Sequence, residues 1–524
     1  MTFVNENTYQ RFRTEGREEE FHTRYEKAMK DAVLSLGRTH PLHIGGKSRH
    51  SGNGVFEVAS PQNRELLIGR FQKGTAKDAA DAIHAAHEAF SSWKEEDYRT
   101  RASIVRAAAE IAADRKFMIA AAMTLENGKN RFEAMGDVDE GIDFMRYYAE
   151  LITINRGYAT EMGKSGPSED NRSLMKPYGV WGVIAPFNFP FAIACGMTTG
   201  AIVTGNTVVL KPSSATPLMS SMLYDIYAEA GIPDGVLNYV TGPGSAVGGE
   251  IARNGLVQGI VFTGSRETGL ELSRRFNREN FKPFISEMGG KNVVIVTESA
   301  NMEIAVAGTA RAAFGFGGQK CSAASRAIIH RKIKKEFTER LVEYTKKLKV
   351  GDPSDRDTFM GPVIDSGALS KYERAVLDAR ESGLVLTGGN VLKNETMQKG
   401  FFVEPTIVDA LPADHRLLTE ELFLPVLALT EYDSFDEAVE FANSVDYGLT
   451  AGIFSGSKEE LKRFFECVDA GVCYANKASG ATTAAIVGAQ PFVGWKMSGS
   501  TGRGAGGMYY LLQFMREKTL SVFG

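Results

Sequence analysis

Cys321 lies in the segment best suited to nucleophilic chemistry. Residues 314–327 read FGFGGQKCSAASRA, so three glycines precede the cysteine and small residues follow it. Glycine lets the backbone approach a ligand closely, and small neighbours leave a thiol unshielded, as a reactive cysteine requires. A lone cysteine in a glycine-rich turn is also typical of a purely structural position, so further residues are needed to decide.

Two further segments contribute a carboxylate and an amide. The segment FISEMGGKN, residues 284–292, places Glu287 after an apolar, strand-like run and before two glycines. The segment APFNFPF, residues 185–191, places Asn188 between two phenylalanines. Taken singly, Glu287 is explained as a surface or capping carboxylate, and Asn188 as a turn residue.

Together, the three segments resemble the aldehyde dehydrogenase superfamily, and the similarity extends over nearly the whole chain. Glu287 precedes Cys321 by 34 residues, the separation found in hydrolytic members of that family. The resemblance implies that Cys321 is the nucleophile and Glu287 the general base. It also implies an oxyanion hole made of the Asn188 side-chain amide and the Cys321 backbone N–H.

These residue types suit the oxidation of an aldehyde to a carboxylic acid. A thiolate adds to the aldehyde carbon, hydride passes to a nicotinamide cofactor, and water then cleaves the thioester. Preorganised donors stabilise the oxyanion, and the loss of one typically costs ~2.7–4 kcal/mol. Because a carboxylate activates the water, Glu287 favours release of a free acid over transfer of the acyl group to coenzyme A. The intact set of residues disfavours a catalytically silent binding protein, and the cofactor segments disfavour a thioesterase without redox chemistry.

The expected phosphate-binding segments lack the G-x-G-x-x-G fingerprint of many dinucleotide sites. The resemblance instead implies that the pyrophosphate of NAD binds at Gly264 and Ser265, where FTGSRETG turns from a strand into a helix and offers an anion site. The loop TGPGSAVG contributes Gly244 beside it.

The resemblance also assigns residues to the two ribose groups of the cofactor. Lys211 resembles the lysine that binds the adenosine ribose, and Glu421 and Phe423 resemble the pair that holds the nicotinamide ribose and ring. Ser214 stands where many NAD-preferring relatives carry glutamate. Since a glutamate there would repel a 2′-phosphate, we expect NADP to support turnover beside NAD. Leu424 replaces the usual glycine of this motif.

Within the superfamily, the chain most resembles the 1-pyrroline-5-carboxylate dehydrogenase branch, which oxidises L-glutamate γ-semialdehyde to L-glutamate in proline catabolism. The segments that carry this resemblance are the N-terminal extension, IDFMRYYAE, QKCSAASRA, MGPVID and AIVGAQPFVGWKMSG. It implies a substrate site in which phenylalanines sandwich the aliphatic chain and small residues bind the amino-acid end, namely Phe189, Phe492, Ser322, Ala484 and Ala485.

Three departures from the branch pattern keep a broad-specificity aliphatic or aromatic aldehyde dehydrogenase open as the alternative. Ala484 stands in place of glycine, and Val493 also replaces glycine. Arg146 stands where some members carry an acidic residue that faces the substrate's ammonium group.

Composition excludes several other classes of protein. The 524 residues carry a formal charge of −4 with a pI near 6.2, so there is no basic field to bind nucleic acid or an anionic membrane. We find neither a long apolar segment nor a signal core, and therefore expect a cytoplasmic protein. Four cysteines without C-x-x-C spacing predict free thiols and neither a disulfide framework nor a metal site.

The alternation of apolar runs with helical patterns predicts an α/β fold with parallel sheets. The runs VWGVI, NTVVLKP, VLNYVTG, GIVFTGS and NVVIV are the expected strands, and a helix is expected to begin after Thr75. We expect a Rossmann-type NAD(P)-binding domain, a catalytic α/β domain and a β-strand oligomerisation arm that makes the protein a homo-oligomer, a dimer or larger. The expected ranges are 1–153 and 178–290, including an N-terminal extension over 1–50, then 291–499, and finally 154–177 with 500–524.

Overall fold

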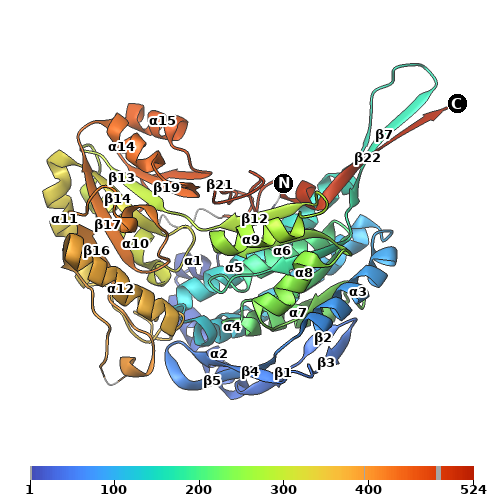
Figure 1. Ribbon diagram of the computed structural model, residues 1–524, viewed down its shortest axis with the longest axis horizontal. Coiled ribbons are helices and arrows are strands. Elements are labelled where there is room, and N and C mark those ends of the chain that lie inside the picture. The colour runs from blue at the N-terminus through green and yellow to red at the C-terminus, as the bar shows by residue number, and fades with distance from the viewer. Residues whose placement is uncertain (1–2, 395, 479–485) are drawn as a thin grey trace.

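The computed structural model describes residues 3–394, 396–478 and 486–524, which form two α/β lobes and a projecting arm (Figure 1). Each lobe is built on a seven-stranded sheet, which confirms the predicted α/β fold. None of the helices in these ranges is long and apolar enough to cross a lipid bilayer.

The sheet of the first lobe is parallel over five neighbouring strands. Its order is β12 (Phe284–Met288), β11 (Val257–Gly264), β8 (Val180–Ile184), β9 (Thr207–Lys211), β10 (Leu237–Tyr239), β2 (Leu42–Ile44) and β3 (Lys47–Arg49), with β2 antiparallel to β10. Both faces are covered, so β8 and β9 are buried throughout and read as continuous apolar runs.

Helices cover the two faces of this sheet in separate groups. Side chains alternate along a strand, so Val209 packs against one group while Val208 and Leu210 pack against the other. The first group is α3 (Ala76–Trp93), α8 (Gly249–Arg253) and α9 (Arg266–Phe276), and the second is α4 (Tyr98–Asn127), α5 (Arg131–Ile154), α6 (Ala192–Val203) and α7 (Pro217–Glu229). As predicted, Thr75 caps α3, and it forms a reciprocal capping box with Asp78.

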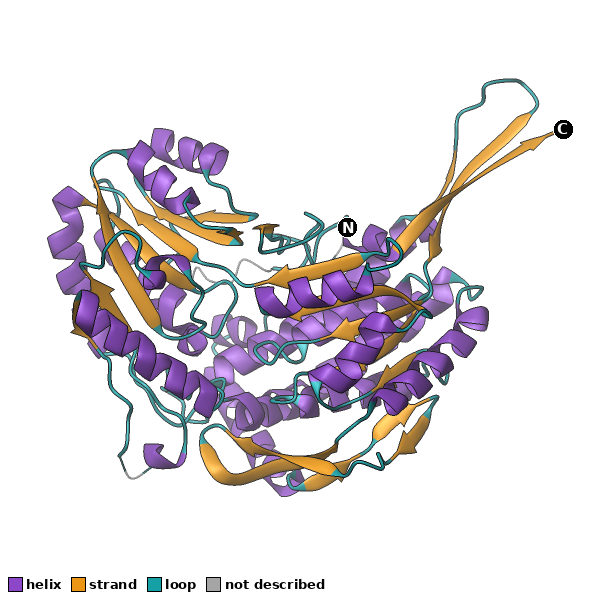
Figure 2. Cartoon of the chain, in the orientation of Figure 1, coloured by secondary structure: helices purple, strands orange, loops and turns teal. Residues whose placement is uncertain are grey.

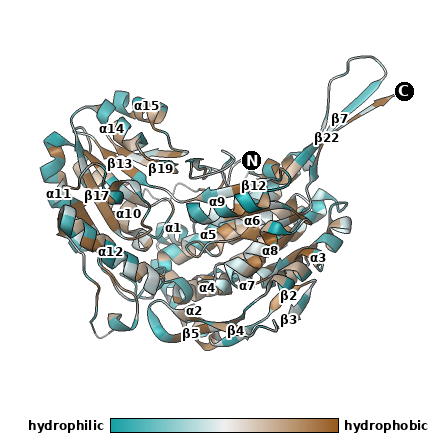
Figure 3. Cartoon of the chain, in the orientation of Figure 1, coloured by the Kyte–Doolittle hydropathy of each residue, from teal (hydrophilic) through white to brown (hydrophobic). Residues whose placement is uncertain are grey.

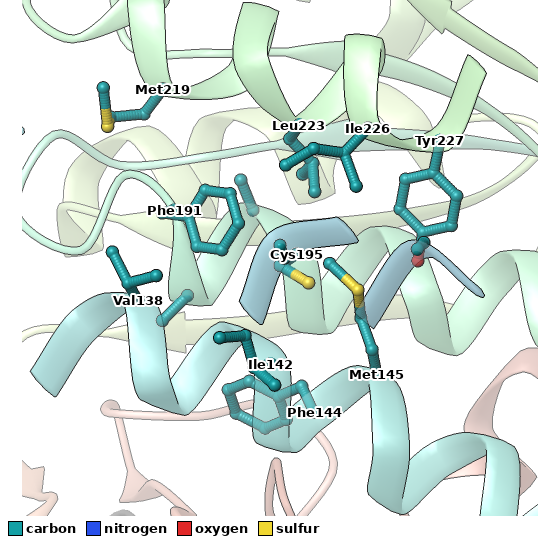
Figure 4. Close-up of a cluster of buried hydrophobic side chains, with 14 of the residues drawn as sticks. Val138, Ile142, Phe144, Met145, Phe191, Cys195, Met219, Leu223, Ile226 and Tyr227 are labelled. Carbon is teal, nitrogen blue, oxygen red and sulfur yellow. The ribbon is translucent and has the colours of Figure 1, made fainter. Parts of the chain in front are cut away.

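The second group packs closely enough to bury a cysteine completely. Figure 4 shows Cys195 of α6 surrounded by apolar side chains of α5 and α7. Its Sγ lies 3.3 Å from the carbonyl oxygen of Gly141, where a larger residue would meet the Phe191 ring. We therefore assign Cys195 to packing.

The second lobe contains the segment expected to carry the nucleophile. Its sheet has the order β15 (Leu384–Thr387), β16 (Thr406–Asp409), β17 (Val426–Tyr432), β14 (Ala324–His330), β13 (Asn292–Val296), β19 (Thr450–Phe454) and β20 (Val472–Ala475), and only the β15–β16 pairing within it is antiparallel. The helices are α10 (Met302–Phe314), α11 (Arg331–Lys346), α12 (Ser366–Ser382), α13 (Arg416–Thr419), α14 (Phe435–Asn443) and α15 (Lys458–Cys467). Figure 3 shows hydrophobic colouring on strands such as β13 and hydrophilic colouring on the outer helix α11.

The arm is a three-stranded antiparallel sheet that extends beyond both lobes without a helix beside its tip (Figure 2). Strand β22 (Met515–Phe523) pairs with β7 (Glu169–Pro177) along its whole length, and β6 (Ala159–Glu161) pairs with the other edge of β7. Strand β22 begins well after the expected boundary at residue 500. The residues just before it are buried in the first lobe, among them Tyr510 and Phe514.

The N-terminal extension forms two helices. These are α1 (Thr8–Thr14) and α2 (Glu18–Ser35). Helix α2 packs on α4 and buries Phe21 and Tyr25 completely. A small sheet of β1 (Arg38–His40), β5 (Asn63–Gln72) and β4 (Val55–Ser60) follows, and a short β18 (Tyr447–Gly448) pairs with β21 (Trp495–Lys496) in the second lobe.

Candidate active site

One cavity brings together most of the residues that the sequence nominated for catalysis and substrate binding. It is lined by residues of α5, α6, β11, β12, the cysteine loop and the C-terminal segment. The nominated residues in its wall are Phe189, Glu287, Cys321, Ser322 and Phe492. Asn188 is not part of the lining, but it is buried directly before Phe189, in the turn between β8 and α6.

The loop that carries Cys321 is held in place by close backbone contacts. Gly318 has a φ of +65°, and a Cβ there would lie 2.4 Å from the carbonyl oxygen of Leu424, so only glycine fits. The Asn292 amide, at the start of β13, donates to the carbonyl oxygens of Cys321 at 2.7 Å and Ala323 at 2.9 Å. These contacts fix the position of the thiol before any substrate binds.

Burial disfavours the thiolate form of Cys321 in this structure. Burial is the main cause that raises the pKa of the thiol to about 12, and the negative charges of Glu421 and Glu287 add to it. The backbone N–H groups of Ser322 and Cys321 act in the opposite direction, because they stabilise negative charge at this position. Backbone N–H groups beside the thiol are the kind of donor that stabilises an oxyanion during attack on a carbonyl.

Glu287 reaches the cavity from the end of strand β12. Its carboxyl accepts a hydrogen bond from the Gly494 N–H, and burial raises its pKa well above the usual range. Oxygen Oε2 has no hydrogen-bond partner. A buried carboxyl with a free oxygen, in the same cavity as the thiol, is suited to take a proton from a water molecule at the cysteine.

Phe189 is held by charged residues that the sequence analysis did not identify. The Lys129 ammonium lies 3.5 Å from the centroid of the Phe189 ring and 2.7 Å from Oδ2 of Asp137. Oδ1 of Asp137 accepts a hydrogen bond from the N–H of Ala192, the first residue of α6. The lysine–aspartate pair is fully buried, so it fixes both the ring and the start of the helix. Lys129 and Asp137 lie among many other charged residues in 126–146, so nothing in the sequence distinguished this pair.

The structure corrects the expectation for Arg146. Its guanidinium pairs with Glu6 at 2.5 Å and Glu110 at 3.0 Å, and it does not line the cavity. The acidic residue of α5 that lines the cavity is Glu140, six positions earlier and therefore on another side of the helix. Burial, followed by the charge of Asp137, raises the pKa of Glu140 to about 8.

The residues expected to bind the pyrophosphate lie where strands of the first lobe end. Gly264 ends β11, and the hydroxyl of Ser265 caps α9 by accepting from the Thr268 N–H. Gly244 begins a single helical turn that continues into α8. A helix N-terminus beside a glycine turn fits a phosphate group because it offers free backbone N–H groups.

The residues expected to bind the adenosine ribose lie at the end of β9. Burial lowers the pKa of Lys211 to about 8, and its ammonium donates to the carbonyl oxygen of Pro212 at 2.9 Å. A Cβ at Gly248 would lie 3.9 Å from the Lys211 side chain, so the helical turn that begins at Gly244 passes beside it. Ser214 is exposed. A lysine and a hydroxyl beside this turn fit a sugar and its phosphates.

The residues expected at the nicotinamide end approach the catalytic pair from the second lobe. Oε1 of Glu421 accepts the N–H of Gly290 at 3.0 Å, and burial raises the pKa of Glu421 to about 7. Phe423 adopts a φ of +61°, and its ring centroid lies 5.6 Å from that of Phe187. The Leu424 side chain that replaces the expected glycine is buried in the core of the second lobe. Ala484 and Ala485 lie outside the described residues.

Comparisons with known proteins agree with this arrangement. Residues 48–520 match the model of the aldehyde dehydrogenase family, and the chain belongs to that family. It is 41% identical over 503 residues to a 1-pyrroline-5-carboxylate dehydrogenase of Geobacillus sp. (strain WCH70), with 95% of each chain covered. It also resembles a Thermus 1-pyrroline-5-carboxylate dehydrogenase solved with bound NAD, with a TM-score of 0.94, 34% identity, and coverage of 100% of this chain and 99% of that one. The chain spans about half of proline utilization A from Bdellovibrio bacteriovorus, with coverage of 96% of this chain and 52% of that protein, 36% identity and a TM-score of 0.91.

Proposed function

We propose that this protein oxidises L-glutamate γ-semialdehyde to L-glutamate with NAD as the hydride acceptor. The observation that carries this proposal is the lining of the cavity. Phe189 and Phe492 give it apolar walls for a short aliphatic chain, and Glu140 places one carboxyl group in the same wall. An ammonium group in the cavity would stabilise the ionised form of Glu140, which burial otherwise disfavours. The relatives named above support the same substrate.

The reaction divides into two halves that use different residues. In the first half, the Cys321 thiol releases its proton to water and its sulfur adds to the aldehyde carbon, while the Asn188 amide and the Cys321 N–H stabilise the oxyanion. NAD supplies the acceptor for the hydride that leaves this carbon. In the second half, Glu287 takes a proton from water, the hydroxide attacks the thioester carbon, and the carbon–sulfur bond breaks. Overall, an aldehyde, NAD⁺ and water give a carboxylate, NADH and two protons.

Three further properties belong to the same proposal. NADP supports turnover as well, because Ser214 is uncharged and exposed. The arm joins subunits into a homo-oligomer, because β22 is an exposed edge strand whose tip carries Val522 at 62% and Phe523 at 71% exposure. The protein works in the cytoplasm, where the four free cysteines stay reduced.

An aldehyde panel tests the proposed substrate. The wild-type enzyme is expected to show a higher kcat/KM with L-glutamate γ-semialdehyde than with propanal, hexanal or benzaldehyde at one pH, followed by NADH absorbance. Glu140→Gln is expected to raise the KM for the semialdehyde and leave that for hexanal unchanged. Glu150→Gln, on the same helix but outside the cavity, is the matched control. A simple aldehyde that exceeds the semialdehyde in kcat/KM would establish the broad-specificity alternative, which the apolar walls also fit.

A further inference from the structure

Residues 3–8, which we call the N-terminal strap, precede the part of the chain that matches the family model. Figure 1 marks the N-terminus beside the C-terminal loops. The strap lies between α5, which lines the cavity, and the loop 486–490, which leads to Phe492 in the cavity wall. Its contacts therefore bear on the shape of the cavity.

Asn5 joins the two elements through one amide group. Its Nδ2 donates to Oδ2 of Asp143 on α5 at 2.9 Å and to the carbonyl oxygen of Val487 at 3.0 Å. An amide has two N–H donors, so both hydrogen bonds form at once. The two hydrogen bonds therefore fix the distance between Asp143 on α5 and the Val487 carbonyl oxygen in the loop 486–490.

Acidic side chains of α5 hold the strap along its length. Oδ1 of Asp143 accepts the N–H of Glu6 at 2.9 Å, and Asp139 accepts both the N–H of Thr8 at 2.6 Å and its hydroxyl at 2.7 Å. Glu6 is also buried against Lys116 at 2.6 Å and against Arg146 at 2.5 Å. The position of Asn5 is therefore set by the buried, charge-assisted contacts of the residues that follow it in the strap.

Phe3 adds an apolar contact to the same loop. Its ring centroid lies 5.1 Å from that of Tyr147 on α5. Gly488 has a φ of +78°, and a Cβ there would lie 3.1 Å from the Phe3 ring and 3.2 Å from the Tyr147 ring. The glycine backbone thus packs against both aromatic rings.

Backbone hydrogen bonds connect the loop 486–490 to residues that line the cavity. The N–H of Gly488 donates to the carbonyl oxygen of Gly506, and Phe492 and Ala505 exchange two backbone hydrogen bonds at 2.8 and 2.9 Å. Phe492 and Ala505 line the cavity, as Glu140 and Phe144 of α5 also do. Glu140 and Asp143 are three positions apart on one helix, so a shift of α5 relative to the loop changes the distance between the two walls.

We propose that the N-terminal strap determines aldehyde specificity, with Asn5 as a positioning residue that sets the separation between α5 and the loop 486–490. The proposal rests on the proposed substrate, whose amino-acid end needs both walls at once. A simple aldehyde needs only the nucleophile, the base and an apolar wall. Asn5 does not line the cavity and has no part in the chemical steps.

Asn5→Ala tests the proposal, and Gln10→Ala, at an exposed side chain of α1, is the matched control. We expect Asn5→Ala to raise the KM for L-glutamate γ-semialdehyde about tenfold, equivalent to ~1.4 kcal/mol, with kcat unchanged. The kcat/KM for hexanal is expected to stay at the wild-type value. Phe3→Leu, which keeps an apolar side chain and loses the ring contacts, is expected to shift the KM in the same direction if Asn5→Ala does not fold.

The two aldehydes separate a failure of this proposal from a failure of the proposed function. A wild-type enzyme that prefers hexanal would refute the proposed substrate without any variant. If the wild type prefers the semialdehyde, equal losses with both aldehydes in Asn5→Ala would show that the strap contributes stability alone. An unchanged KM in both Asn5→Ala and Phe3→Leu would also overturn the proposal.

Discussion

Replacement of Glu287 by glutamine separates hydride transfer from hydrolysis. Glutamine has nearly the same shape as glutamate, and its carbonyl oxygen can keep the hydrogen bond that Gly494 donates to the carboxyl. The amide cannot take a proton from water. Hydride transfer depends on Cys321 and on the hydrogen-bond donors that stabilise the oxyanion, so it is expected to proceed. The thioester is expected to accumulate, because its hydrolysis has lost the base.

The expected decrease in steady-state turnover follows from the loss of a general base. A positioned base contributes ~10²–10⁴-fold, which corresponds to ~2.7–5.5 kcal/mol in the barrier. Rapid-mixing absorbance measurements are therefore expected to show a burst of about one NADH per site, followed by steady turnover reduced by that factor. Intact-protein mass spectrometry is expected to find the acyl group on Cys321. Unchanged steady-state turnover would refute the assignment and place the base elsewhere.

The same variant predicts a change in the pH dependence of stability. The folded-state pKa of Glu287 lies well above the unfolded value of ~4.3. The folded protein binds the proton more tightly, so this contribution is complete below pH ~4.3 and is lost as the pH rises through the folded pKa. Because glutamine does not titrate, the Glu287→Gln variant does not lose this contribution to stability as the pH rises. The Tm of Glu287→Gln relative to wild type is therefore expected to increase with pH, and a Tm difference that does not depend on pH would contradict the raised pKa.

Three further predictions concern the nucleophile, the cofactor and the arm. Cys321→Ser is expected to abolish NADH formation while retaining the NAD-induced rise in Tm, because a serine hydroxyl is a far weaker nucleophile than a cysteine thiolate; substantial turnover would exclude Cys321 as the nucleophile. Both cofactors are expected to support turnover in the wild type, and Ser214→Glu is expected to lower kcat/KM for NADP at least about tenfold with little change for NAD, because a carboxylate repels the 2′-phosphate. A wild-type preference for NAD beyond ~10³-fold, or ~4 kcal/mol, would assign discrimination to another element. Light scattering at micromolar concentration is expected to find a dimer or larger and a smaller species after deletion of 515–524, and a fully active wild-type monomer would refute the role of the arm.

Much of the fold could be predicted because its signals are local. The capping pair Thr75 and Asp78 marks the start of α3 within four residues, and continuous apolar runs mark strands buried on both faces. The family motifs around Asn188, Glu287 and Cys321 are equally local. The order of these motifs along the chain was enough to nominate the groups and the chemistry.

The carboxyl group of Glu140, which lines the cavity together with that of Glu287, could not be assigned from the sequence. Several charged side chains lie on α5, and the direction of each depends on how the helix packs. Glu140 faces the cavity, Asp139 and Asp143 face the N-terminal strap, and Arg146 pairs with Glu6 and Glu110. The expectation for Arg146 was wrong because resemblance in sequence does not specify which side of a helix is buried.

Taken by itself, the sequence determined the class of fold and the family and nominated the catalytic trio, because these depend on residue type and short-range pattern. Only the tertiary structure decided which side chains share the cavity and what holds them there. The Lys129 contact with Phe189 and the hydrogen bond from Asn5 to Val487 join segments that lie far apart in the chain, the latter pair by 482 positions. Contacts at such separations leave no periodic trace in the sequence, because their energy depends on packing and desolvation that exist only once the lobes have formed.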